Sequence, residues 1–167
     1  MKTTQEGLDR LHENVREITR RHNEATEEAR IALSDQGPEE NEGYYHAKSR
    51  CHQLESQIVA LQAEIRNAEI VDEVVFDGAV GFGTIVTALN LETDKESVYT
   101  ILGEPDANAK RGILSYTSPI GSGLLGHRVG DVVDVDMPNG RTISFEILTV
   151  ELSSYVKPKA PDTSSEV

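Results

Sequence analysis

The sequence predicts an α+β protein, with an N-terminal antiparallel coiled-coil hairpin followed by a small domain on a twisted antiparallel β-sheet. Two apolar series that step mostly by alternate threes and fours predict the arms of the hairpin, within residues 8–33 and 44–68. Ser34, Gly37 and Pro38 interrupt this pattern, and so short a connection returns the second helix antiparallel to the first. Beyond Gly78 the heptads give way to short β-like segments.

The first arm carries an apolar seam formed by Leu8, Leu11, Val15, Ile18, His22, Ala25, Ala29 and Leu33. The second arm repeats the pattern with Tyr44, Ala47, Cys51, Leu54, Ile58, Leu61, Ile65 and Ala68. Arms of about 25 to 30 residues, at about 1.5 Å per residue, predict a projection of about 40 Å. We assign residues 1–75 to the hairpin, and expect Cys51, the sole cysteine, to be a buried apolar residue of the seam.

Five segments rich in β-branched residues predict the strands of the second domain, at 84–91, 97–102, 113–116, 131–136 and 141–152. Pro138-Asn139-Gly140 predicts a hairpin turn, because Asn-Gly readily adopts positive φ angles. Ser118 and Pro119 predict the start of a short helix that reaches residue 125. The domain is expected to span 76–156, and the polar segment 157–167 to be a flexible tail.

The tip of the hairpin, at about residues 34–44, concentrates negative charge. Asp35, Glu39, Glu40 and Glu42 lie within eight positions, and no lysine or arginine occurs from 31 to 47. One interpretation is that these side chains only solvate a turn. The other is that their mutual repulsion suits a borrowed cation, since Mg²⁺ is commonly held by one or two carboxylates together with water and substrate phosphate oxygens.

Composition limits the function classes. The chain has 167 residues and a net charge of -13, which opposes autonomous binding to nucleic acid, because phosphate contacts need a basic surface. No apolar run approaches the roughly 20 residues that span a bilayer, and no secretory signal is evident, so a cytoplasmic protein without a membrane partner is expected. A monomer is expected as well.

Several motifs occur in order along the chain. The second half contains Phe82-Gly83-Thr84-Ile85-Val86-Thr87, a segment from Ser118-Pro119-Ile120 through Leu124-Leu125-Gly126-His127-Arg128-Val129-Gly130-Asp131, and Pro138-Asn139-Gly140. The first half contains Glu40-Asn41, Gly43-Tyr44 and Tyr45-His46-Ala47 at the tip, then Asn67-Ala68-Glu69-Ile70-Val71-Asp72. Over nearly its whole length the chain therefore resembles the bacterial GreA/GreB transcript-cleavage factors.

This resemblance implies an accessory factor and not an enzyme in its own right. A C-terminal domain with an FKBP-like fold would dock at the rim of the secondary channel of bacterial RNA polymerase, while the coiled coil enters the channel. Tip carboxylates would then help to hold a Mg²⁺ ion shared with the polymerase active site and stimulate cleavage of backtracked RNA. The residues expected to dock are Ser118, Pro119, Leu124, Leu125, Gly126 and His127.

The tip departs from the pattern of the family it resembles. The usual Gly-Asp-Leu-Lys/Arg-Glu-Asn is replaced by Gly37-Pro38-Glu39-Glu40-Asn41, which lacks the aspartate and the basic residue. Glu40 carries over as a catalytic and metal-binding carboxylate, and either Asp35 or Glu39 takes the place of the aspartate. Asp35 could take this place if the loop folds back, and Glu39 could do so through its longer side chain. Pro38 restricts the backbone of the turn, and the sequence does not choose between the two. The alternative function is a channel-occupying regulator that inhibits polymerase without cleavage.

Contacts to the nascent RNA 3′ end or the active site are expected from Asn41, Tyr44, Lys48 and Arg50. Tyr44 is open to two interpretations, stacking on a nucleobase or packing in the helical seam. A basic path for RNA along Arg20, Arg21, Arg30, Lys48 and Arg50 competes with the view that these charges form a solvated face. The histidines form no zinc motif, and sparse aromatic residues argue against prolyl isomerisation. A coiled-coil adaptor unrelated to transcription is the remote alternative.

Overall fold

The computed structural model describes residues 1–36 and 41–159. The chain divides into two compact units: a hairpin unit, residues 9–68, and a globular unit that combines residues 1–8 with the chain from Glu69 onward. The predicted boundary at residue 75 therefore differs from the observed division, because both ends of the hairpin segment join the globular unit. In the part of the chain that is described, no helix is long and apolar enough to cross a membrane.

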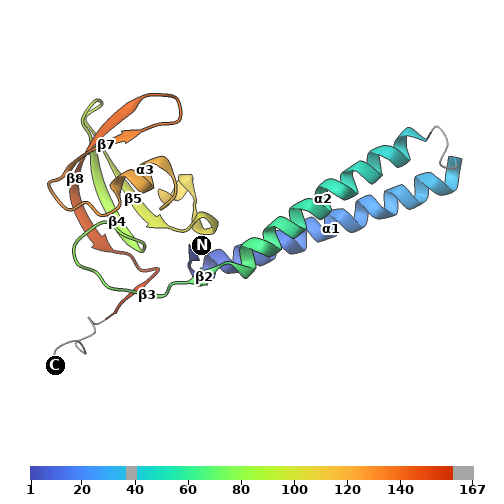
Figure 1. The fold of residues 1–167 in the computed structure, drawn as a ribbon, viewed down its shortest axis with the longest axis horizontal. Coiled ribbons are helices and arrows are strands. Elements are labelled where there is room, and N and C mark those ends of the chain that lie inside the picture. Colours follow the sequence, from blue (N-terminus) through green and yellow to red (C-terminus); the bar gives the residue numbers. More distant parts are fainter. Residues whose placement is uncertain (37–40, 160–167) are drawn as a thin grey trace. The chain divides into compact units, whose positions relative to one another are not determined.

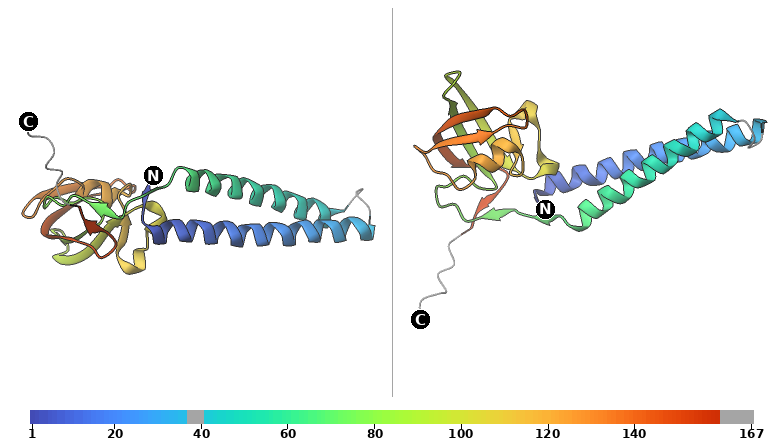
Figure 2. Two further views of the ribbon diagram at one scale, coloured as in Figure 1. Left: turned by 90° about the horizontal axis from the view of Figure 1, so that it is seen from below. Right: turned by 45° about the horizontal axis from the view of Figure 1, so that its top comes forward.

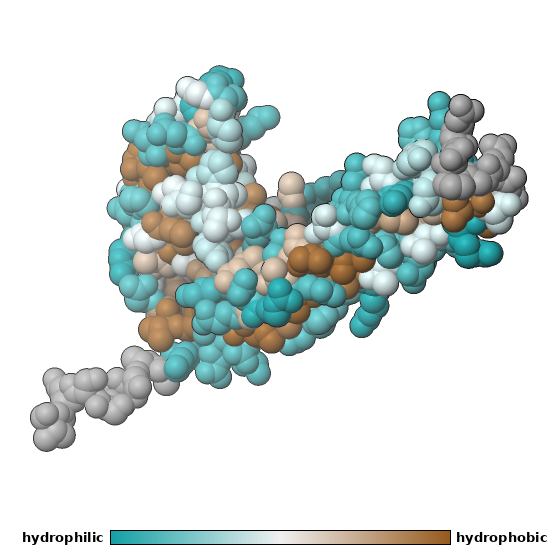
Figure 3. All heavy atoms as spheres, turned by 45° about the vertical axis from the view of Figure 1, so that its right-hand side comes forward, coloured by the Kyte–Doolittle hydropathy of each residue, from teal (hydrophilic) through white to brown (hydrophobic). Residues whose placement is uncertain are grey.

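The hairpin unit consists of α1 (Gln5–Gln36), whose first residues belong to the globular unit, and α2 (Glu42–Arg66), as predicted. The two helices run side by side in opposite directions (Figures 1 and 2). Four apolar side chains of the seam are buried, namely Leu11, Ala25, Ala47 and Leu54. Two helices enclose little volume, so the other described apolar seam residues stay partly exposed, and Leu33 is 40% exposed. The surface drawn in Figure 3 is accordingly polar with separate apolar patches.

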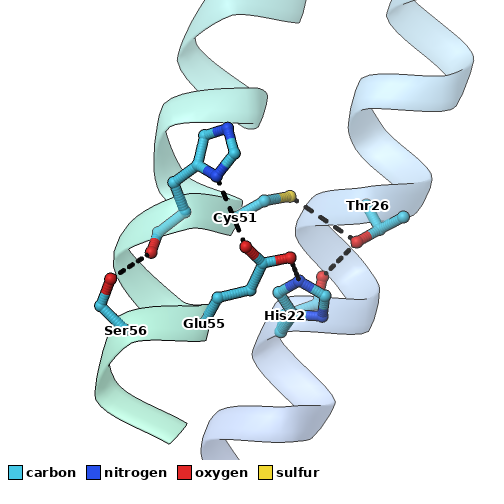
Figure 4. Close-up of polar contacts among 6 residues, drawn as sticks. His22, Thr26, Cys51, Glu55 and Ser56 are labelled. Atoms are coloured by element: carbon cyan, nitrogen blue, oxygen red, sulfur yellow. Dashed lines mark hydrogen bonds and ion pairs between the residues drawn. The ribbon is translucent and has the colours of Figure 1, made fainter. Parts of the chain in front are cut away.

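Polar contacts cross the middle of the seam (Figure 4). One carboxylate oxygen of Glu55 lies 3.2 Å from Nε2 of His22 across the seam, and the other lies 3.4 Å from Nδ1 of His52 on the same helix. Cys51 Sγ lies 3.6 Å from Oγ1 of Thr26. Cys51 is therefore half-buried beside a hydroxyl, which corrects the prediction of a buried apolar residue.

The globular unit is built on a five-stranded sheet of order β6-β5-β4-β8-β7. Its strands confirm the five predicted segments: β4 (Thr84–Asn90), β5 (Lys95–Leu102), β6 (Ile113–Ser115), β7 (Val132–Asp136) and β8 (Thr142–Leu152). All neighbours are antiparallel except β5 and β6, which are parallel, so the sheet is mixed and not purely antiparallel as predicted. Asn139 Oδ1 accepts from the Arg141 amide in the turn between β7 and β8, and Gly140 has a φ of 79°.

The core lies on one face of this sheet, where alternate residues of β4, β7 and β8 meet the short helix α3 (Pro119–Leu124). Its buried members are Val80, Val86, Ala88, Ile101, Leu124, Val133, Val135, Phe145 and Ile147. A Cβ at Gly123 would lie 2.7 Å from a methyl carbon of Val135. Glycine therefore allows α3 to approach β7 closely.

Both ends of the described chain are held in the globular unit. The strands β1 (Lys2–Thr3) and β2 (Glu69–Ile70) pair in parallel, and so do β3 (Glu73–Val74) and β9 (Lys157–Pro158). The predicted tail therefore begins with a strand, whereas residues 160–167 lie outside the described chain. Two 3₁₀ turns, η1 (Glu104–Asp106) and η2 (Ala109–Arg111), connect β5 to β6.

Asp106 in η1 is buried and receives hydrogen bonds from the N-terminal residues. Its Oδ2 accepts from Thr3 Oγ1 at 2.9 Å and from the Thr4 amide at 3.1 Å, while Oδ1 accepts from Thr4 Oγ1. Thr4 Oγ1 in turn accepts from the Gly7 amide at 3.1 Å, as an N-cap does. Sequence reasoning missed this cluster, although Thr3-Thr4 before the first apolar series was a possible cap signal.

Candidate functional site

The carboxylates predicted to act at the tip fall mostly outside the described residues. Glu39 and Glu40 belong to the segment 37–40, which is not described. Asp35 lies in the last turn of α1, although its side chain is not described. Among the described residues, no three His, Cys, Asp or Glu side chains form a group that could hold a metal ion.

The two helix ends at the tip carry helix-dipole charges of opposite sign. The last turn of α1 contains no basic residue to offset the negative end of the helix dipole, which lies near Asp35. The positive end of the other helix dipole lies at the start of α2, where Asn41 is the N-cap and Glu42 is in the first turn. The end of α1 is thus a place where a cation would be stabilised.

Asn41 connects the two helices at the tip. Its Oδ1 accepts from the Tyr44 amide at 3.0 Å and caps α2, while its Nδ2 donates to the carbonyl oxygen of Ala32 in α1 at 2.6 Å. The side chain is only 5% exposed. Asn41, expected to contact RNA or the active site, therefore has a structural role in the hairpin: it fixes where α2 begins relative to the end of α1.

Aromatic and basic side chains follow this cap on the first turns of α2. The rings of Tyr44 and Tyr45 meet edge to face, with centroids 5.5 Å apart and an interplanar angle of 64°. Lys48 places Nζ 5.7 Å from the centroid of the Tyr44 ring. Tyr45 is 57% exposed whereas Tyr44 is partly buried, so Tyr45 is the more accessible ring, consistent with the heptad pattern, which includes Tyr44 but not Tyr45.

Most of the predicted basic path along the hairpin is paired with carboxylates. Arg20 pairs with Glu17 at 2.7 Å and also with Glu24, Arg30 pairs with Glu27 at 2.6 Å, and Arg50 pairs across the hairpin with Glu28 at 2.5 Å. These arginine side chains hold the pKa values of Glu17 and Glu27 below their usual range through hydrogen bonds and charge. Lys48, by contrast, makes no ion pair with a described carboxylate. These pairs favour a solvated charged face over a continuous basic path.

The segment expected to dock on polymerase is placed in the globular unit with mixed exposure. Ser118 caps α3: its Oγ accepts from the Gly121 amide at 3.2 Å and donates to the Ser115 carbonyl at 2.7 Å. Pro119 is the first residue of the helix. Leu124 is fully buried, so it cannot contact a partner and instead anchors the segment in the core.

The other members of that segment lie at the surface. Leu125 helps to line a depression of about 390 Å³ with Met1, Lys2, Glu69, Phe82 and Tyr116. Gly126 adopts a φ of 80°, and its amide donates to the Val80 carbonyl at 2.8 Å. His127 is partly exposed and lies 3.5 Å from Asp131. The accessible part of the predicted docking segment is therefore Pro119, which is exposed, together with residues 125–127.

The loop that follows is fastened to the chain ahead of β4. Arg128 Nη2 lies 2.6 Å from Asp77 Oδ2, and its Nη1 donates to the Asp77 carbonyl. The Ala79 amide also donates to Asp77 Oδ1 at 3.1 Å. That amide, together with the Arg128 guanidinium, holds the pKa of the Asp77 carboxyl below its ordinary value. Exposed groups thus keep the loop in place at neutral pH.

Comparisons with known proteins match both units. The family described as "Transcription elongation factor, N-terminal" matches residues 1–70, and "Transcription elongation factor, GreA/GreB, C-term" matches residues 76–152. Transcription elongation factor GreA of Clostridioides difficile (strain 630) is 38% identical over 151 residues, which cover 88% of this chain and 93% of that protein. GreA of Clostridium botulinum (strain Langeland) is 37% identical over 149 residues, with coverages of 88% and 92%.

A solved structure, that of GreA factor homolog 1 of Thermus thermophilus, is 26% identical and covers 90% of this chain and 98% of its own, with a TM-score of 0.41. The sequence matches extend over both the hairpin and the sheet, and they confirm the family that the motifs resemble. The chain belongs to the GreA/GreB family of transcription elongation factors.

Proposed function

We propose that the protein binds bacterial RNA polymerase, inserts its hairpin into the secondary channel and stimulates Mg²⁺-dependent cleavage of backtracked RNA. Polymerase carries out the hydrolysis, and this chain completes the metal site from outside. The exposed Pro119 and residues 125–127 of the globular unit are the proposed contact with polymerase. Arrested elongation complexes would be rescued when cleavage creates a new RNA 3′ end at the active site.

The observation that carries this proposal is the acidic tip at the end of a long, narrow pair of helices. The 25 residues of α2 correspond to about 38 Å of helix at 1.5 Å per residue, long enough to reach into a channel. Four carboxylates in the segment 35–42 have no basic neighbour in sequence between 31 and 47. Their repulsion favours a cation that a partner supplies.

The chemistry is phosphodiester hydrolysis by two metal ions. In such a site one ion would activate the attacking water and the other would stabilise the leaving oxygen, and the tip carboxylates would help to hold one of the two ions. Carboxylates from the tip would strengthen its binding and orient the water. Asp35, Glu39 and Glu40 are the proposed ligands of this shared ion.

A cleavage assay on a stalled, backtracked polymerase complex with end-labelled transcript tests the proposal. The wild-type protein and Mg²⁺ should shorten the RNA, and Glu40→Ala should slow cleavage at least about tenfold, the order of effect seen for supporting residues of metal sites. Asp35→Ala and Glu39→Ala identify which carboxylate replaces the family's aspartate.

Glu64→Ala is the matched control, since it removes the same charge from an exposed position on α2 outside the tip. It should cleave like the wild type. Equal cleavage by the wild type and all three tip variants would refute a role for these carboxylates.

A channel-occupying inhibitor is the second candidate, favoured by the replacement of the family's aspartate by Pro38 in the turn. Proline fixes its own φ angle and disfavours the helical conformation for the residue before it. These limits reduce the number of ways in which the carboxylates of the turn can be brought together. An inhibitor would bind the same complex and slow nucleotide addition without shortening the transcript.

A further inference from the structure

The two adjacent tyrosines at the start of α2 have different surroundings. The Tyr44 ring is partly buried, with the edge-to-face contact of Tyr45 on one side and Nζ of Lys48 at 5.7 Å. Tyr45 is 57% exposed. Tyr44 is therefore held in place and steadies its neighbour, while the Tyr45 ring has free surface for a partner.

The position of Tyr45 on the helix brings it close to the tip. It lies in the first turn of α2, and side chains of α-helices lean toward the helix N-terminus. Its neighbours one turn away are Glu42, Lys48 and Ser49, of which Ser49 is small. The ring thus lies one turn from the carboxylate-bearing Glu42, and of its two C-terminal neighbours Ser49 is the small one.

The charge around this ring limits what can bind to it. Carboxylates at the tip repel the phosphates of a nucleic acid, and Lys48 is the single lysine or arginine among residues 42–49 to offset this. The face of a nucleobase is uncharged and stacks on aromatic side chains without regard to sequence. Charge complementarity therefore favours a base over the sugar-phosphate backbone.

We propose that the exposed Tyr45 ring is a stacking surface for an unpaired base at the 3′ end of the backtracked transcript. This inference rests on the proposed function and adds to it the residue that holds the RNA. Tyr44 supports the ring, and Lys48 would contact the phosphate on the 5′ side of the stacked base. Tyr45 positions the RNA and takes no part in proton or phosphoryl transfer.

The test uses the full-length protein with a backtracked polymerase complex whose RNA carries 2-aminopurine at its 3′ end, in buffer without Mg²⁺ so that no RNA is cut. Stacking on the ring should quench the fluorescence with the wild type and with Tyr45→Phe, but not with Tyr45→Leu. Leucine favours helix and keeps an apolar side chain, so α2 should persist. Val59→Ala, at an exposed position of α2 beyond the first turns, is the control and should quench like the wild type.

With Mg²⁺ and saturating factor, Tyr45→Leu should cleave about 5- to 150-fold more slowly, the range expected for the loss of one base–aromatic stack. Polymerase affinity should stay the same. If the fluorescence is quenched with Tyr45→Leu, or is not quenched when the wild type is bound, this inference alone is overturned. A parallel loss of polymerase affinity would show that the ring meets a protein surface. Failure of the wild type to bind polymerase would overturn the proposed function as well.

Discussion

Asp106 holds the first residues of the chain in the globular unit, and Asp106→Ala should release them. The substitution removes the acceptor of three hydrogen bonds, from Thr3 Oγ1, the Thr4 amide and Thr4 Oγ1. A buried donor without an acceptor costs about 1–3 kcal/mol, so a simple sum gives about 3–9 kcal/mol. Water entering the vacated volume relieves part of this, because one site contains all three donors. We expect a loss of about 3–5 kcal/mol in the free energy of unfolding.

Calorimetry and hydrogen exchange measure the effect separately. For a chain of this size, each kcal/mol lowers Tm by about 2–4 °C, so Tm should fall by about 6–20 °C. Amides that depend on the held segment should exchange faster: that of Thr4, and that of Val71, which donates to the Thr3 carbonyl at 2.9 Å. Amides in β4 and β8 should keep most of their protection.

Glu104→Ala is the matched control, since it removes an exposed carboxylate from the same 3₁₀ turn. It should change stability by less than about 0.5 kcal/mol, as is usual at such surface positions. If Asp106→Ala melts within about 1 °C of this control and the Thr4 amide stays protected, the hydrogen bonds do not hold the segment, and the reasoning is refuted.

Three further predictions concern backbone space and surface charge. Gly7→Ala should destabilise the protein by about 1–3 kcal/mol in thermal melts, since a Cβ would lie 2.3 Å from Thr3 Oγ1, whereas Gly43→Ala should be neutral or stabilising. Asp77 has a lowered pKa in the folded protein, so its contribution is present above the usual carboxyl pKa and is lost as the pH falls; the stability gap to Asp77→Asn should therefore close below about pH 4, and a constant gap would contradict this. Arg50→Ala should cost less than about 1 kcal/mol in urea unfolding, because its ion pair is solvent-exposed, and a loss above 2 kcal/mol would show that the pair is structural.

The elements of this fold were largely predictable from local patterns. Heptad spacing identified both arms of the hairpin, and β-branched runs between Gly, Pro and Asn identified all five strands of the main sheet. Ser118-Pro119 correctly predicted a capped helix. These features succeed because the period of a helix or strand is a property of neighbours in sequence, which side-chain shape and turn chemistry control directly.

The candidate site was only partly predictable. The sequence showed the cluster of charge at the tip and the ordered motifs. The comparisons confirm the GreA/GreB family, which the motifs resemble. Exposure was only partly predictable: the heptad pattern placed Tyr44 in the seam, where it is partly buried, but only the structure showed that the adjacent Tyr45 ring is 57% exposed. Leu124 likewise carried the pattern of a docking residue but lies in the core.

The sequence by itself determined the helical arms, the strands, the acidic tip and the motifs of the family, because each depends on residues within a few positions of one another. Only the tertiary structure decided that β6 runs parallel to β5, and that Asp106 accepts from Thr4, 102 positions earlier in the chain. Such contacts depend on the path of the whole backbone. A buried carboxylate needs donors wherever the fold can bring them, and no local pattern states which residues those are.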